Sequence, residues 1–321
     1  MGMSQLHFVL AVPKHFKMPI QAGSMLRGAF GHALRALSCK TGAQQCAGCP
    51  QVQKCAYPEV FERKAQALAE ERVSLPSPYV IQPGESQPLP VGAQHYEYRF
   101  SMRLFGEGVQ HYLPDIVKAW DQALTTGLGT PKVSMQLLKV SQEQPRQVIW
   151  SHDSPTHAPL LMATPSFILP PLEPQPKIEV QFKRPLRLKY QNKIVKTSQL
   201  NLTLLMRAAI RRNQLILSEL IPQFQTHPIC APINCSDLQD VKIQQDLKWQ
   251  DWHRYSNRQQ QSMTLGGIVG RIVIPAKTLT PQQWQHLQLA TYTHIGSHTV
   301  FGMGEITLKR PTLSLNTRLT K

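Results

Sequence analysis

The chain has 321 residues, of which 41% are apolar, so it is long enough for two domains with sizeable cores and is not disordered by composition. Its 35 Lys and Arg against 19 Asp and Glu give a formal net charge of +16, which favours an acidic partner, either nucleic acid or an anionic membrane surface; a basic protein with a merely well-solvated surface is the alternative. No stretch approaches the roughly 18 apolar residues of a membrane span, and the N-terminus lacks a signal-peptide pattern, so we expect a soluble, cytoplasmic protein with no membrane partner.

The first half of the chain alternates between strand and helix patterns. Strands are predicted for residues 6–12, 96–104 and 133–140, and helices for 23–37 and 113–124. The order strand, helix, strand, helix, strand predicts an α+β sandwich of the ferredoxin type.

A proline-rich stretch, residues 164–176, separates the two halves and is predicted to be a linker, because its five prolines forbid a regular helix and interrupt a sheet ladder. We therefore predict an N-terminal domain at 1–163 and a C-terminal domain at 177–321. The second half repeats the rhythm of the first, with extended segments and helices predicted, in chain order, at 178–188, 200–220, 241–255, 267–274 and 281–292. A similar second domain is inferred from this element order alone, since no residue-by-residue repeat is visible.

Four of the six cysteines fall in one loop, residues 39–55, at Cys39, Cys46, Cys49 and Cys55. In a chain that is not exported the thiols stay reduced, and four thiolates within 17 residues, two of them in a C-x-x-C, can form a tetrahedral shell around a structural zinc. An iron–sulfur cluster uses the same ligands, and free loop thiols are a further alternative because the first spacing is wider than in common zinc knuckles.

The predicted helix at 23–37 has an apolar stripe made of Leu26, Phe30, Ala33, Leu34 and Leu37. His32 projects from the opposite face together with Gly28, Gly31 and Arg35. A histidine away from the core, beside glycines that permit close approach and cations that attract phosphate, suits acid/base chemistry near neutral pH. A surface histidine without a role is the alternative.

Aromatic residues and arginines alternate between Trp249 and Arg258. Aromatic rings interleaved with cations such as Arg254 and Arg258 can stack on unpaired bases and hold phosphates. The same pattern fits tryptophans in a core and arginines on a solvated strand face.

The loop at residues 294–304 follows a predicted helix and carries Gly296, Gly302 and Gly304 among hydroxyls and two histidines. Glycines in such a loop can present bare backbone amides to a polyanion, although a glycine near a helix end is also an ordinary terminator. The chain has no P-loop lysine motif, no G-x-G-x-x-G after a first strand and no dense carboxylate cluster. Hydrolysis by two metals and a small-molecule cofactor are therefore not expected.

Taken together, four places in the chain resemble the CRISPR-associated endoribonucleases that cut precursor CRISPR RNA within its repeats, members of the repeat-associated mysterious protein (RAMP) superfamily. They are 26–35 leading into the cysteine loop and Cys55-Ala56-Tyr57-Pro58, then 78–81, then 254–259 with Gly266-Gly267, and finally 294–304. These stretches span most of the chain and keep the family's order.

The resemblance implies two tandem ferredoxin-like (RRM-like) domains, the first with a cysteine-rich insertion, and a glycine-rich RNA-binding loop in the second. It implies metal-independent cleavage by 2′-hydroxyl attack, which leaves 2′,3′-cyclic phosphate and 5′-hydroxyl ends. His32 matches the family's general acid/base histidine on the first helix. Where relatives often carry a lysine after the loop's first glycine, this chain has Ser297-His298, so His294 and His298 are fallback catalytic or phosphate-contacting candidates.

We expect the RNA-binding residues to be Arg27, Arg35, Arg254, Arg258, Gly296, Ser297, His298, Thr299, Gly302 and Gly304. The expected partners are CRISPR repeat RNA and other subunits of a CRISPR effector complex, with no cofactor for catalysis beyond a structural zinc. A non-cleaving subunit that binds CRISPR RNA inside such a complex is the alternative, and a DNA-binding or membrane-surface protein is a third hypothesis.

Overall fold

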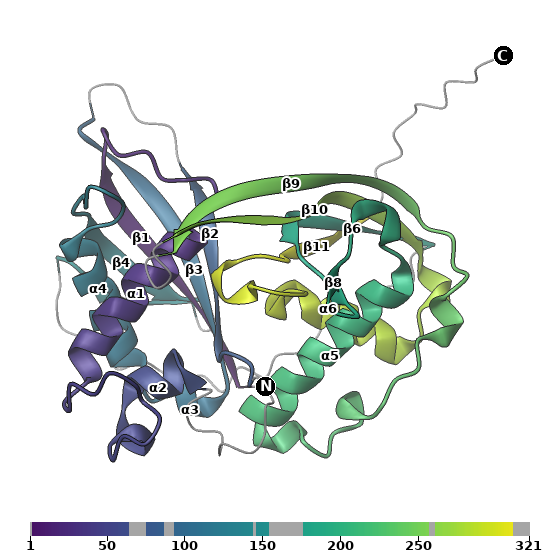
Figure 1. The fold of residues 1–321 in the computed structure, drawn as a ribbon, viewed down its shortest axis with the longest axis horizontal. Coiled ribbons are helices and arrows are strands. Elements are labelled where there is room, and N and C mark those ends of the chain that lie inside the picture. Colours follow the sequence, from purple (N-terminus) through teal and green to yellow (C-terminus); the bar gives the residue numbers. More distant parts are fainter. Residues whose placement is uncertain are drawn as a thin grey trace. The chain divides into compact units, whose positions relative to one another are not determined.

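A computed structural model describes residues 2–63, 75–86, 93–143, 146–153, 176–256 and 261–310 (Figure 1). The predicted linker at 164–176 therefore lies outside the described residues except for its last position. The chain divides into two compact units by its internal contacts. The first comprises 1–168, 212–231 and 298–302, and the second comprises 169–211, 232–297 and 303–321.

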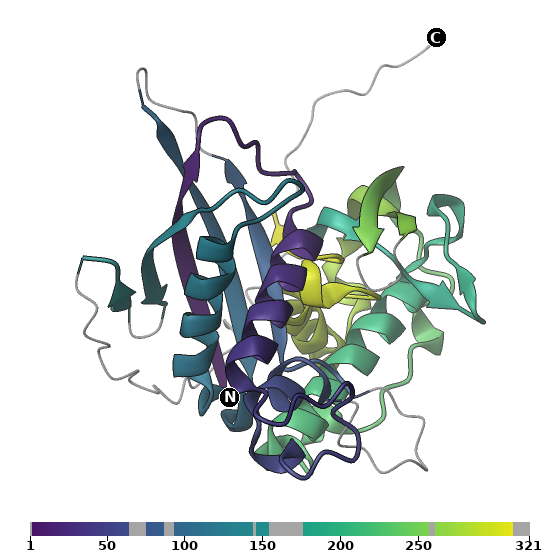
Figure 2. The same cartoon turned by 60° about the vertical axis from the view of Figure 1, so that its left-hand side comes forward.

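The first unit is a five-stranded antiparallel sheet with two long helices on one face (Figure 2). In chain order its main elements are β1 (Met3–Pro13), α1 (Gly23–Ser38), β2 (Tyr79–Ser86), β3 (His95–Phe105), α4 (Leu113–Thr126), β4 (Gln136–Gln142) and β5 (Gln147–Ser151). The strands lie in the order β2-β3-β1-β4-β5. The first four strands and two helices thus have the ferredoxin-like βαββαβ arrangement.

The core of the first unit lies between this sheet and the helices α1 and α4. Alternate residues of β1, among them Phe8, are fully buried, as the period of a half-buried strand requires. The Phe8 ring stacks on Phe100 of β3 with centroids 4.7 Å apart, and Trp120 of α4 stacks on Phe30 of α1 at 4.9 Å. This packing fixes α1, and with it His32, on the sheet.

The second unit repeats the arrangement with four antiparallel strands in the order β11-β6-β10-β9. Its main elements are β6 (Lys177–Leu186), α5 (Leu202–Leu220), β9 (Gln244–Ser256), β10 (Gln261–Pro275), α6 (Pro281–Thr293) and β11 (Ile306–Lys309). By its contacts, α5 belongs to the first unit from Arg212 onward. The prediction of two tandem ferredoxin-like folds is confirmed.

Shorter elements complete the description. They are the helices α2 (Ala56–Val60) and α3 (Glu107–Gln110), the hairpin β7 (Lys189–Tyr190) and β8 (Lys193–Ile194), and the 3₁₀ turns η1 (Val52–Lys54), η3 (Thr197–Gln199), η4 (Pro222–Phe224), η5 (Pro228–Cys230), η6 (Ser236–Leu238), η7 (Ala276–Thr278) and η8 (Thr299–Phe301). Among the described helices, none combines the length and apolarity needed to cross a bilayer.

The strand β2, whose residues include Pro83 and Gly84, was not predicted from the sequence. β2 lies at the edge of the sheet, where a proline costs no ladder hydrogen bond, and its pairing with β3 shifts register between Pro83 and Ser86. A side chain at Gly84 would collide with the carbonyl oxygen of Arg99 on the neighbouring strand. Pro83 and Gly84 are thus compatible with this irregular edge strand.

Candidate active site and RNA-binding loop

His32 lies in the third turn of α1 with its side chain exposed. Gly28, four residues earlier, shares this face of the helix. Within the described part of the chain and apart from the helix itself, no atom comes within 4 Å of the position that a Gly28 Cβ would occupy. The imidazole thus stands beside a smooth, open helix surface, as the sequence predicted.

Gly31 and Leu37 differ from the predicted helix faces. Gly31 is buried, because the Phe61 ring lies across α1 at a point where any side chain would collide with it. Leu37, assigned to the apolar stripe, is 45% exposed near the end of the helix. Of the stripe, Leu26, Phe30, Ala33 and Leu34 are buried as predicted.

Arg27 and Arg35 lie on the stripe of α1 that also contains Gly31, not on the His32 face. The Arg27 guanidinium carbon lies 4.1 Å from the centroid of the Phe61 ring. Arg35 donates from Nη2 to the carbonyl oxygens of Ala43 and Gln44, at 2.6 and 2.8 Å. Both arginines thus fasten the segment that follows α1, and their predicted role as phosphate ligands stays a prediction.

Sequence analysis did not single out Phe61 as the centre of an aromatic cluster. Its ring stacks on Tyr57 and Tyr79, with centroids 5.4 and 6.4 Å away. Burial raises the pKa of Tyr57 to about 12, and the Glu62 carboxylate adds to the shift. The apolar spacing of Tyr57, Val60 and Phe61, at i, i+3 and i+4, is the signal that could have revealed this short helical turn.

The loop at 294–304 folds back on itself and on residues 185–187. Several of its backbone N–H groups donate within the chain, among them four that belong to the glycine turn: Ile295 to Gly304 O at 3.0 Å, Ser297 to Arg187 O at 2.9 Å, Gly302 to Thr299 O at 2.9 Å and Gly304 to Pro185 O at 3.0 Å. The prediction that the loop presents bare amides is wrong for these four groups. Its glycines allow the backbone conformation of the turn.

The loop glycines are required by backbone geometry. Gly296, Gly302 and Gly304 have φ angles of 88°, 96° and 70°, which side chains disfavour. A side chain at Gly304 would collide with the Ile295 carbonyl oxygen, and one at Gly296 would come within 2.5 Å of Arg187 O. The backbone path of the loop therefore requires glycine at these positions.

The two loop histidines have different environments. His294 is fully buried, and its Nδ1–H donates to Met303 O at 3.3 Å. Its φ of 61° and ψ of 170° lie in a region that essentially only glycine adopts. This position favours a structural role for His294 over the predicted fallback catalytic one. His298 is exposed and stacks on Phe301 with centroids 5.3 Å apart.

Residues 298–302 of the loop pack on the first unit, against α1 and β2. The Phe301 carbonyl sits over Gly23, the first residue of α1, where a side chain would collide with it. Val300 packs on the core of this unit, and Thr299 is 3% exposed. The exposed His298 thus belongs to the same compact unit as His32.

The Trp249 ring is engaged within the second unit. Lys196 Nζ lies 4.0 Å from its centroid, its Nε1–H donates to Asp251 Oδ1 at 2.7 Å, and Gly266 leaves room for it on β10. These contacts favour the structural interpretation of Trp249. Arg254 pairs through its backbone with Met263, but its side chain and the whole of Arg258 lie outside the described part of the chain.

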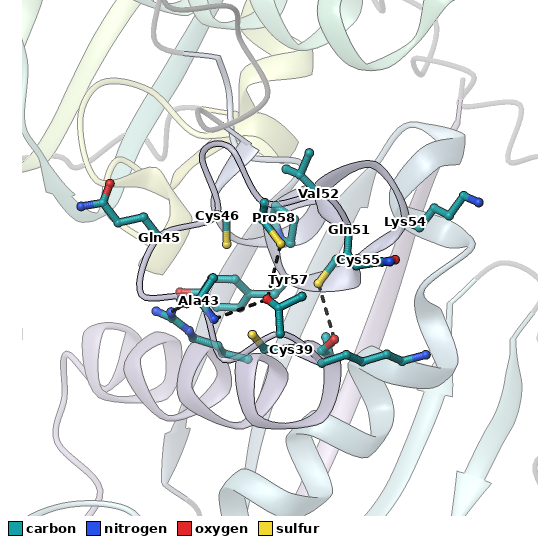
Figure 3. A pocket seen from close by; sticks show the side chains of 15 residues that line it. Cys39, Ala43, Gln45, Cys46, Gln51, Val52, Lys54, Cys55, Tyr57 and Pro58 are labelled. Carbon is teal, nitrogen blue, oxygen red and sulfur yellow. Dashed lines mark hydrogen bonds between the residues drawn. The ribbon is translucent and has the colours of Figure 1, made fainter.

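The four loop cysteines line one cavity of about 190 Å³ (Figure 3). Hydrogen bonds, chiefly from the Gly42 backbone, lower the pKa of Cys39, whereas burial raises the pKa of Cys46 to about 11. As placed, no three His, Cys, Asp or Glu side chains of the described residues stand close enough together to bind a metal.

Two family models match the chain. Residues 1–161, half of the chain, match the AF_1859_N family, an N-terminal domain. Residues 180–306 match the CRISPR-associated endoribonuclease Cas6. None of the curated proteins matches this sequence.

Solved structures share the fold. A Cas6 (TTHB231) product complex aligns over 96% of this chain and 99% of its own, with a TM-score of 0.51 and 14% identity. The TTHB231 protein is from Thermus thermophilus. A Cas6 (TTHA0078) product complex aligns over 97% of this chain and all of its own, with a TM-score of 0.48 and 15% identity.

The Cas6 (TTHB231) product complex agrees with the fold of this chain. The first likeness extends over nearly the whole chain, and at 14% identity it concerns the fold alone. The family matches cover 1–161 and 180–306, which together include α1 with His32 and the whole loop at 294–304. The chain belongs to the AF_1859_N family, whose model covers half of it, and its residues 180–306 are similar to the CRISPR-associated endoribonuclease Cas6.

Proposed function

We propose that this protein is a metal-independent endoribonuclease that cleaves precursor CRISPR RNA within its repeats. The Cas6 match over residues 180–306 carries the proposal. The net charge of +16 supports it, because a polyanion is the partner that such a charge attracts.

In the proposed reaction the 2′-hydroxyl at the cleavage site loses its proton, and its oxygen attacks the adjacent phosphorus. The bond from phosphorus to the 5′-oxygen breaks, and this oxygen takes up a proton. The products carry a 2′,3′-cyclic phosphate and a 5′-hydroxyl. The enzyme supplies alignment, proton transfer and stabilisation of charge.

His32 is the proposed general acid or base. Its imidazole is exposed on a helix that is held from beneath by the packing of Phe30 on Trp120. The bare surface at Gly28 on the same face lets a ribose and its phosphate approach the ring closely. An exposed imidazole on a rigid helix can exchange protons with the substrate.

The loop at 294–304 is the proposed support for the RNA backbone. His298 and Ser297 are its accessible polar side chains, since Thr299 and His294 are buried. Residue 301 packs at Gly23, nine residues before His32, which corresponds to roughly 13 Å along the helix. We assign residues 298–302 of the loop to nucleotides beside the cleavage site. Arg254 and Arg258 are proposed to contact further phosphates of the RNA.

The cleaved guide RNA is proposed to remain bound and to enter a CRISPR effector complex. The similar structure of Cas6 TTHB231 is described as a product complex, which is consistent with retention. An enzyme that holds its product turns over once. A non-cleaving RNA-binding subunit would share this affinity and differ only in lacking the cut.

The test uses the full chain and the repeat RNA identified by sequencing RNA that copurifies with it. Cleavage is run in excess EDTA, and the fragments are then recovered free of the chelator. The downstream fragment should accept a 5′-phosphate from a kinase directly. The upstream fragment should resist 3′-tailing until its cyclic phosphate is removed. A repeat of shuffled sequence is the control. Fragments with 5′-phosphate ends would contradict the mechanism, and tight binding without cleavage would favour the non-cleaving subunit.

A further inference from the structure

The cysteine-rich loop is closed at both ends by helices of the first unit. Cys39 ends α1, and its backbone N–H donates to Arg35 O at 2.9 Å. Cys55 directly precedes α2, and its Sγ lies 3.6 Å from Ser38 O. The first and last cysteines of the loop are thus brought together although 15 residues separate them.

The two middle cysteines are brought toward the same place by a tight turn. The Cys49 N–H donates to Cys46 O at 3.1 Å, and Gly48 between them has a φ of 77°. A further contact joins Cys49 Sγ to Thr41 Oγ1 at 3.5 Å. This turn presents both thiols of the C-x-x-C toward the ends of the loop.

All four thiols line the single cavity of about 190 Å³. The labelled sulfur atoms of Cys39, Cys46 and Cys55 point toward its interior from three different parts of the loop (Figure 3). None of the four is in a disulfide. Arg35 fixes the loop backbone at Ala43 and Gln44, so the cavity has a firm wall.

We propose that this cavity binds one zinc ion through Cys39, Cys46, Cys49 and Cys55. Zinc takes four thiolates in a tetrahedron with Zn–S distances of about 2.3 Å, and four cysteines from one loop satisfy that demand without another ligand. As they stand, the four side chains line the cavity without forming a metal-binding group among the described residues. The proposed binding therefore requires them to rotate toward its centre.

The zinc fastens the end of α1 to the start of α2. His32 lies seven residues before Cys39, roughly 10 Å along the helix, so the metal has no part in the chemistry. Removal of the metal is expected to loosen the segment after α1, which Arg27 and Arg35 contact. The proposed cleavage thus uses no metal, although the proposed zinc stabilises the end of the helix that carries His32.

Metal content and cobalt substitution test the proposal. Protein purified without chelators should contain about one zinc per chain, and Cys230→Ser, outside the loop, should contain the same. Cys46→Ser and Cys49→Ser should lose most of it. Cobalt added to metal-free protein should give intense visible bands of a tetrahedral site and near-ultraviolet thiolate-to-cobalt charge transfer. Removing zinc should lower the Tm by roughly 5–15 °C.

Several outcomes would overturn the zinc site: a weak octahedral cobalt spectrum, iron in place of zinc, or an unchanged Tm after chelation. The cobalt titration of the wild-type chain decides the matter even where a serine variant fails to fold. The zinc site stands independently of the proposed function. Its failure leaves cleavage in EDTA untouched, and failure of cleavage leaves the cobalt spectrum untouched.

Discussion

His32 combines exposure with a rigid support, and its replacement tests the proposed chemistry. We expect His32→Ala to lower the rate of cleavage about 10²- to 10⁴-fold, the usual contribution of a general acid or base. RNA affinity and Tm should change little, because the side chain is exposed and alanine suits a helix. Single-turnover cleavage and a melting curve measure the two.

His111→Ala is the matched control, since His111 is also exposed in the first unit. It should cleave like the wild type. Full activity of His32→Ala would remove His32 from the mechanism. A large loss of Tm in that variant would instead mean that the imidazole is structural.

His294 is expected to stabilise the loop rather than to transfer protons. His294→Ala should lower the stability by about 1–3 kcal/mol, since it removes a buried side chain and its hydrogen bond to Met303. His294→Gly should be less destabilising, because glycine adopts the backbone angles of this position without strain. Well below the Tm, both should cleave at a rate near that of the wild type. A rate loss like that of His32→Ala would restore His294 as a catalytic candidate.

For single residues, the sequence predicted the surroundings of a side chain correctly where the residue's own helix determines them. The period of α1 correctly placed His32 outward and Phe30 inward. It could not reveal what covers Gly31 and Arg27, because Phe61 returns from beyond the cysteine loop. Nor could it show that His294 is buried, which depends on how residues 185–187 and 294–304 fold together.

The start of α1 and the loop at 294–304 are packed so closely that glycine is needed at their contact. Gly23→Ala should destabilise the protein by several kcal/mol, since its Cβ would collide with Phe301 O and leave only 2.9 Å to Pro83. Gly28→Ala, on the open face of the same helix, should stabilise by about 0.5–1 kcal/mol. Denaturant unfolding compares the two. Equal effects would contradict the described packing.

Most elements with strong periodicity were predicted within a few residues, although β10 begins at Gln261 and not at residue 267, and the irregular elements were missed. Both ferredoxin-like repeats followed from the alternation of strands and helices. β2 escaped notice because its proline and glycine are tolerated only at a sheet edge, and β5 because it has five residues. Whether a strand lies at the edge depends on the assembled sheet, so local sequence patterns do not predict it.

The predicted boundaries at 163 and 177 describe the chain order but not the compact units. Residues 212–231 and 298–302 join the first unit, whose core receives Val300. A side chain at Gly106 would collide with the Leu220 carbonyl oxygen, another sign of this packing. These contacts join residues that are far apart in the sequence, so local sequence patterns cannot predict them.

The whole molecule combines a strongly positive net charge with two ferredoxin-like folds, and we propose that it cleaves RNA. A charge of +16 accounts for affinity to any polyanion, RNA or DNA, and not for the cut. What separates the proposed reaction from simple binding is the nucleophile, which belongs to the substrate. The decisive test of the mechanism therefore removes the 2′-hydroxyl from the RNA and leaves the protein unchanged.

The direct measurement is cleavage of the cognate repeat RNA in EDTA, compared with the same RNA carrying a single 2′-deoxyribose at the cleavage site. We predict that the all-ribose RNA is cut and the substituted one is bound with similar affinity but left intact, because the attacking oxygen is missing. A deoxyribose one nucleotide further away is the control and should be cut. Cleavage of the substituted site would contradict the account, and so would cleavage that stops in EDTA at a temperature where the chelated protein is still folded.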